Sequence, residues 1–116
     1  MSPNVIFQTV MILSKEKSRL EKLLAAVNAV NIDDEANVEM LNELVSSFSE
    51  GLMTLYRSHA NTFANIVNYD LAEIRNNKRT IKKNAIDRSR QLDLAVYKES
   101  VVHAIERTLE YIDAYL

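Results

Sequence analysis

The sequence predicts an all-α fold, an antiparallel bundle of three long helices over about residues 3–30, 34–76 and 84–115. Apolar residues recur every three or four positions through long stretches, which places their side chains on one face of a helix. The chain also has one Gly and one Pro among 116 residues, and few turn residues mean few, long elements. This length fits a single domain over residues 1–116.

The longest apolar pattern runs from Val38 to Tyr69. Its ten positions keep a three-four spacing without a slip, and eight of them are apolar or aromatic. They form a narrow seam of the kind on which a partner helix packs in a coiled coil. The two polar positions, His59 and Thr62, are neighbours and predict a polar layer in the core. The ten positions are Val38, Leu41, Val45, Phe48, Leu52, Leu55, His59, Thr62, Ile66 and Tyr69.

The first helix is expected to start at Ser2-Pro3, because Ser is a favoured N-cap and Pro is tolerated at the first helical position. Lys17 is the one misfit in its seam, and its aliphatic stem is expected to lie along the seam. From Val5 to Leu13, apolar residues cover nearly the whole circumference. This surface needs two helices of the same chain, another chain or, as a third alternative, a membrane surface.

The stretch from Asn31 to Asp34 is the clearest break, and its short length makes the first two helices antiparallel neighbours. A four-helix bundle with a break near Ser47–Gly51 is the alternative fold, because Ser47 and Glu50 have capping-box spacing and Gly51 is the only glycine. The seam passes through this stretch without a change of phase, which favours a continuous helix. Gly51 would then let another helix approach closely.

Positive charge is concentrated between residues 75 and 90, where seven basic residues and one acidic residue give a net charge of +6. We expect the turn between the second and third helices over residues 76–83. This segment is interpreted as a solvated helix end, as a contact for the phosphates of nucleic acid, or as a contact for an acidic protein. The seven basic residues are Arg75, Lys78, Arg79, Lys82, Lys83, Arg88 and Arg90.

The third helix carries apolar and aromatic residues over more than half of its circumference, and a narrow polar strip includes Glu99, His103 and Glu106. Two helices of the same chain, or one helix and a second protomer, would cover the apolar part. Tyrosines suit an interface because each has an apolar ring and a polar hydroxyl. With the first helix, the predicted protein interface comprises Val5, Phe7, Met11, Ile12, Tyr97, Val101, Tyr111 and Tyr115.

The chain lacks the common catalytic motifs. One Gly excludes a glycine-rich phosphate loop, and the absence of Cys excludes thiolate chemistry. His59 lacks the following Lys that is usual in phosphotransfer domains, and His103 lacks the second Glu/His pair of a helical di-metal site. We therefore predict a non-enzyme with no catalytic residue, no cofactor, no metal and no small-molecule substrate.

No apolar run reaches the ~18–20 residues that span a bilayer. With no signal-peptide pattern at the N-terminus, we expect a cytoplasmic protein. The predicted function is a non-catalytic protein–protein interaction module, such as a small regulator, chaperone, inhibitor or immunity-type protein, that self-associates as a homo-oligomer. The alternative is a nucleic-acid-associated protein that contacts phosphates through residues 75–90.

Overall fold

Four long helical segments run up and down the long axis of the part of the chain that the structure describes. The structure is a computed structural model, which describes the backbone of residues 3–33, 36–83 and 88–116 and the side chains of residues 9–33, 37–81 and 91–116. A six-residue helix, α3, and a π-helical turn, η1, join α2 to α4. The elements are α1 (Pro3–Asn28), α2 (Ala36–Ser58), α3 (Ala60–Asn65), η1 (Ile66–Asp70), α4 (Leu71–Lys83) and α5 (Arg88–Tyr115).

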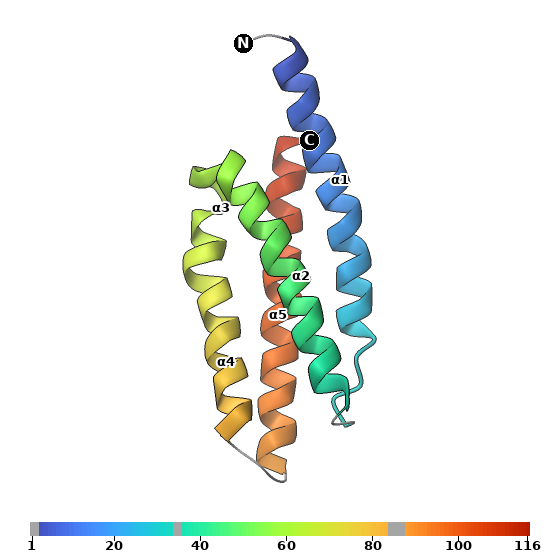
Figure 1. The fold of residues 1–116 in the computed structure, drawn as a ribbon, viewed down its shortest axis with the longest axis vertical. Helices are drawn as coiled ribbons and strands as arrows, with labels where there is room; N and C mark the ends of the chain where they lie inside the picture. The colour runs from blue at the N-terminus through green and yellow to red at the C-terminus, as the bar shows by residue number, and fades with distance from the viewer. Residues whose placement is uncertain (1–2, 34–35, 84–87) are drawn as a thin grey trace.

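The all-α bundle is confirmed, and the four-helix alternative describes it better than three helices do. Figure 1 shows α2 and α4 running in opposite directions, with α3 at the corner between them. The break predicted near Ser47–Gly51 is wrong, because α2 continues through this stretch and the chain turns at His59 instead. A single helix over residues 34–76 would be about 65 Å long, which exceeds the 57 Å long axis of the molecule.

The turn at His59 follows from its local hydrogen bonds. His59 has non-helical backbone angles, φ −139° and ψ 59°. Its N–H still donates to the carbonyl of Leu55 at 2.8 Å, and its own carbonyl accepts from the N–H groups of Thr62 and Phe63, both at 3.2 Å. The Ser58 hydroxyl donates to carbonyls of the preceding turn, which competes with helix propagation. One residue thus closes α2 and opens α3 without a loop.

The predicted seam of the second helix is buried from Leu41 to Leu55 and again at Ile66. Beyond the turn, the buried side chains are Phe63, Ile66, Leu71 and Ile74, whereas Tyr69 is 70% exposed. The five-residue π turn shifts the phase of the buried face, because a π turn holds more residues than an α turn. The buried residues before and after the turn therefore belong to two helical segments with different directions.

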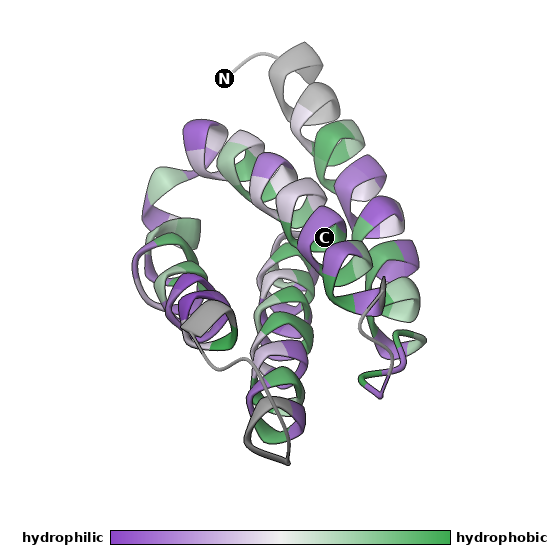
Figure 2. Ribbon diagram, turned by 60° about the horizontal axis from the view of Figure 1, so that its bottom comes forward, coloured by the Kyte–Doolittle hydropathy of each residue, from purple (hydrophilic) through white to green (hydrophobic). Residues whose placement is uncertain are grey.

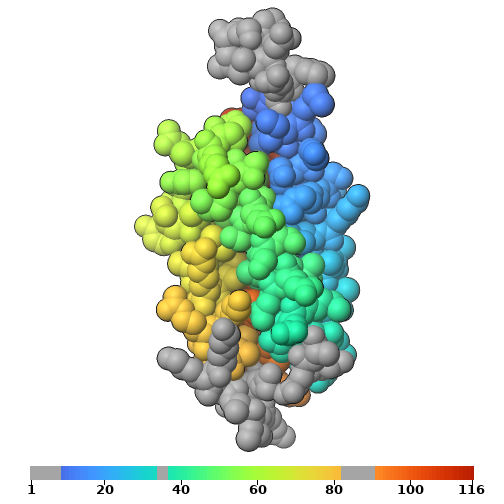
Figure 3. Space-filling view, viewed as in Figure 1, coloured from blue at the N-terminus to red at the C-terminus, as the bar shows by residue number. Residues whose placement is uncertain are grey.

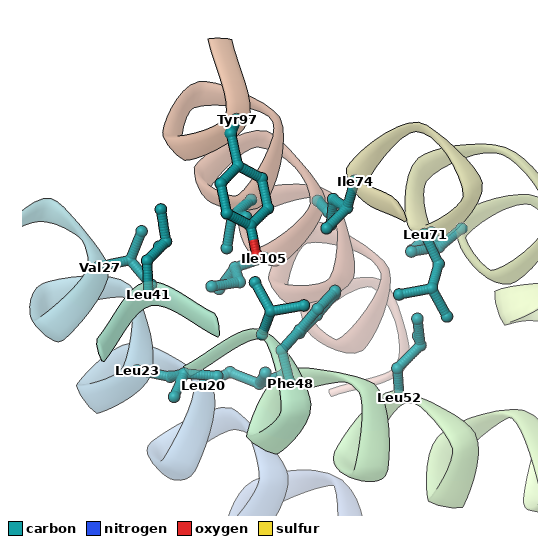
Figure 4. Close-up of a cluster of buried hydrophobic side chains, with 14 of the residues drawn as sticks. Leu20, Leu23, Val27, Leu41, Phe48, Leu52, Leu71, Ile74, Tyr97 and Ile105 are labelled. Atoms are coloured by element: carbon teal, nitrogen blue, oxygen red, sulfur yellow. The ribbon is translucent and has the colours of Figure 1, made fainter. Parts of the chain in front are cut away.

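α5 is the central helix, since it packs against α1, α2 and α4. In the space-filling view of Figure 3, these three helices cover most of α5. Figure 4 shows core side chains from several helices meeting, among them Phe48, Ile74 and Ile105, and each is fully buried. Figure 2 shows hydrophobic and hydrophilic residues on every helix, as expected for amphipathic helices around a shared core.

The predicted break at Asn31–Asp34 is confirmed at its start, where α1 ends at Asn28 and a non-helical connection follows. Lys98 of α5 donates to the carbonyls of Asn28 at 3.0 Å and Val30 at 2.8 Å. These carbonyls have no helical partner, so a cation at this end stabilises it. The cap also ties the end of α1 to α5.

Gly51 leaves room for a side chain of α1 to reach the backbone of α2, whereas the sequence predicted the close approach of a helix. Arg19 lies against Gly51, and a Cβ atom added there would overlap its guanidinium group. This group donates to the carbonyl of Ser47 at 3.1 Å and forms an ion pair with Glu16 at 3.1 Å. The glycine lowers the helix propensity of α2, but it makes room for the hydrogen bond from Arg19 that joins α1 to α2.

We predict that Gly51→Ala stabilises the protein only when Arg19 is absent. In an Arg19→Ala background, the substitution should raise the free energy of unfolding by about 1 kcal/mol through helix propensity. In the wild-type background, it should give no gain, because the new methyl group displaces the guanidinium. Urea unfolding of the four variants measures this coupling. Equal stabilisation in both backgrounds would contradict the contact.

A second prediction concerns Tyr97, whose hydroxyl donates to Oδ1 of Asn42 at 2.7 Å. Burial raises the pKa of Tyr97 to about 12, from an ordinary value of 10.0. The folded state therefore holds the hydroxyl proton of Tyr97 more tightly than the unfolded state does. The resulting contribution to the free energy of unfolding is complete below pH 10 and is lost as the pH rises toward 12.

Tyr97→Phe should lower the free energy of unfolding by about 1 kcal/mol at neutral pH through the lost hydrogen bond. This deficit relative to the wild type should shrink between about pH 10 and 12, because phenylalanine does not titrate. Urea unfolding of both proteins across this range is the measurement. A deficit that stays constant would show that Tyr97 does not titrate differently in the two states.

Candidate functional site

The predicted interface residues separate into exposed and buried groups. Met11 is 55% exposed and Ile12 43% exposed, so both are open to a partner. Tyr97 and Val101 are fully buried in the core, so their assignment to an interface is wrong: α2 and the rest of the core cover this face of α5. Tyr111 is half-buried, and Tyr115 is 51% exposed. The side chains of Val5 and Phe7 lie outside the described residues.

The first turns of α1 extend past the C-terminal end of α5 (Figure 1). The ion pair between Lys17 and Asp113, at 2.8 Å, shows which residues of these two antiparallel helices lie opposite each other. It explains the misfit of Lys17 in its seam, and the bond to Asp113 raises the pKa of this lysine. Antiparallel register places residue 13 about level with the end of α5. We call the exposed residues before it, Val10, Met11 and Ile12, the apolar tip.

The outer face of α5 is a second exposed surface. Its exposed side chains recur with alternating spacings of four and three residues, so they lie along one side of the helix. We call them the outer stripe. It begins with apolar side chains and continues with the polar strip that the sequence predicted. Its members are Leu92, Val96, Glu99, His103, Glu106 and Glu110.

The predicted polar layer lies at the corner between α2 and α4 rather than deep in the bundle. Thr62 Oγ1 and the Tyr115 hydroxyl are 2.6 Å apart and share a hydrogen bond. The ring of His59 lies edge-on to the rings of Tyr115 and Phe63, with centroids 5.3 and 6.5 Å away. His59 Nδ1 also lies 3.1 Å from the hydroxyl of Ser58. These contacts fasten the corner to the C-terminal end of α5.

The sequence did not predict the ion pair that follows the corner. Arg107 Nη1 donates to both carboxylate oxygens of Asp70, at 2.8 and 2.9 Å, and Nη2 donates to the Tyr111 hydroxyl at 2.9 Å. The bond to Tyr111 and then the charge of Asp70 raise the pKa of Arg107. The Asp70 side chain is buried, whereas that of Arg107 is partly exposed. One feature of the sequence could have indicated this burial. Asp70 lies four residues from both Ile66 and Ile74, on the face of the helix that these core residues share.

The basic residues from Arg75 to Lys83 lie on α4, so the predicted turn over residues 76–83 is wrong, and Arg88 and Arg90 lie at the start of α5. Charged side chains on a helix need no turn when its other face packs, as Leu71, Ile74 and Ile81 do here. Arg75 and Arg79 are exposed, and Lys78 lines a groove with Glu39 and Glu43 of α2. The side chains of Lys82, Lys83, Arg88 and Arg90 lie outside the described residues.

The described side chains contain no group of three or more His, Asp or Glu residues arranged to hold a metal ion. His103 shares a groove with Glu73, Glu99 and Glu106, whereas His59 packs at the corner. Within the described residues, no helix is long and apolar enough to cross a lipid bilayer.

Comparison with known proteins finds no matching family model, no matching curated protein and no matching solved structure. The apolar tip and the outer stripe are the two exposed surfaces of this chain that suit contact with a partner.

The Asp70–Arg107 pair gives a third prediction. Arg107→Leu leaves a buried carboxylate without its cation and should lower the free energy of unfolding by about 2–3 kcal/mol. Replacing Asp70 with Leu as well should recover most of this loss, because no unpaired charge then remains. Urea unfolding measures both effects. Lys17→Leu, which breaks the exposed pair with Asp113, is the control and should cost less. An equal decrease in the free energy of unfolding for Arg107→Leu and Lys17→Leu would contradict a larger contribution of the buried pair.

Proposed function

We propose that this protein is a non-catalytic protein-interaction module that self-associates as a homo-oligomer through the apolar tip. The observation that carries the proposal is the exposure of three consecutive apolar residues, Val10, Met11 and Ile12, on a helix that has passed the end of the bundle. Soluble proteins place such side chains together on a surface mainly where something binds. A small regulator, chaperone or inhibitor fits this description.

Self-association is favoured because the tip exposes a broad apolar surface beyond the end of α5. Three consecutive helical residues spread over about 200° of the circumference, at 100° per residue. Leu13, the next residue, is already buried against the bundle, so the tip begins where the chain's own packing ends. The sequence continues the apolar character toward the N-terminus, at Val5, Ile6 and Phe7. Two tips that pack on each other would bury these surfaces symmetrically.

The alternative function, contact with nucleic-acid phosphates, is supported by Arg75 and Arg79, which are exposed four residues apart on α4. It ranks second because Lys78, between them in sequence, faces the carboxylates of α2 in a shared groove. Binding to a generic DNA duplex at low salt, where phosphate contacts are strongest, distinguishes this alternative.

The proposed function predicts that Met11→Glu/Ile12→Glu abolishes self-association, because charges would have to be buried between two tips. Light scattering at micromolar concentration should give an oligomer for the wild type and a monomer for the variant. Met40→Glu/Tyr69→Glu is the matched control, since it adds the same charge at two exposed apolar residues elsewhere and should leave the oligomer intact. A monomeric wild type, or equal dissociation of both variants, would contradict the proposal.

A further inference from the structure

The outer stripe of α5 has the pattern of a helix that packs on one more helix. Its alternating spacing of four and three residues is the repeat that coiled-coil partners recognise. α1, α2 and α4 take the remaining sides of α5, so the stripe faces outward along the helix. Leu92 is 67% exposed and Val96 50% exposed, although both lie in the repeat.

The surface beside the stripe is hollowed on both sides. Between α4 and α5, a groove of about 490 Å³ is lined by Glu73, Val96, Ser100 and Glu106, among others. On the side of α1, two hollows of about 370 and 270 Å³ share Ile32 and Ala95 in their walls. The larger groove and the second hollow also share Glu99 and Val102, so the depressions run together around the stripe. A helix laid along α5 would find walls on both sides.

The charge of this surface specifies its partner. The N-terminal part of the stripe is apolar, whereas its C-terminal part carries Glu99, Glu106 and Glu110, with Glu73 across the groove. Among the described residues, none of these four carboxylates forms an ion pair. A helix that binds here therefore needs an apolar section followed by basic side chains.

This chain does not itself present a helix of that kind. The apolar side chains of its basic helix, α4, are buried in the core. Behind the apolar tip, α1 presents exposed charges of both signs, Lys15, Glu21 and Lys22. Among the described residues, a second copy therefore presents no free helix whose apolar section is followed by basic side chains alone, and a different protein must supply one.

We infer that the outer stripe binds an amphipathic basic helix of a partner protein. Its apolar side chains would pack on Leu92 and Val96, and its Lys or Arg side chains would pair with Glu99 and Glu106. This inference rests on the proposed function as an interaction module and adds the chemistry of the partner. It uses a different surface from the apolar tip.

A labelled synthetic peptide tests the inference by fluorescence anisotropy. The probe is a helix of about 18 residues, long enough to be helical when bound, with leucines in its first half and lysines in its second half. The control peptide has glutamates in place of the lysines. The wild-type protein should bind the basic peptide and not the acidic one.

Two protein variants locate the contact. Glu99→Lys/Glu106→Lys should weaken binding at least about tenfold, because two attractive pairs become repulsive. Glu21→Lys/Glu50→Lys makes the same change in net charge at exposed residues of α1 and α2 and should leave the affinity unchanged. Leu92→Ser/Val96→Ser should weaken binding without any change in charge.

Equal binding of the two peptides, or equal weakening by both charge variants, would overturn the inference, because the attraction would then be non-specific. The inference would also be overturned if the wild type were an oligomer and the Leu92→Ser/Val96→Ser variant a monomer, since a second copy would then occupy the stripe. The Met11→Glu/Ile12→Glu variant separates the two proposals. It should still bind the peptide, whether or not the apolar tip mediates self-association.

Discussion

The ion pair between Asp70 and Arg107 joins the returning chain to α5, directly after the corner between α2 and α4. α2 and α4 can pack on one core only because the chain reverses within residues 59–70, a stretch without Gly or Pro. Local hydrogen bonds at Ser58 and His59 shape the reversal, but they do not hold it against the bundle. The side chains of α5 supply that hold: Tyr115 bonds to Thr62, and Arg107 bonds to Asp70 and Tyr111.

The fixed corner determines which surfaces stay open. Because α4 returns along one side of α5 and α1 occupies another, α5 keeps a single outward side with a helical repeat of exposed residues. Because α1 passes the end of α5, its tip keeps three exposed apolar residues. Both surfaces thus follow from how α5 is surrounded. They differ in chemistry, since the tip is wholly apolar and the stripe changes from apolar to acidic. This difference supports separate partners for the two surfaces.

Residue spacing was sufficient to predict the helical character of the chain and the break after α1, because both depend on local sequence. The position of the reversal was not predictable in this way. The three-four spacing continues across His59 because both sides of the turn are helical, so a change of direction leaves no trace in the pattern. The exposure of Met11, Ile12 and Tyr115 was predictable, because their helices carry more apolar side chains than the rest of the chain can cover. The burial of Tyr97 and Asp70 was not predictable from the sequence, since it depends on contacts between distant segments.

The distance between α2 and α4 tests the central claim, that the chain reverses at His59, most directly. The chain has no native Cys, so Ser46→Cys/Lys78→Cys carries two spin labels at defined residues. Ser46 and Lys78 line one groove, and the reversal predicts an inter-label distance of about 10–20 Å, set by neighbouring helices and the label arms. A continuous helix would separate the two residues by about 48 Å. A measured distance near that larger value would contradict the reversal and the position of α4 beside the outer stripe.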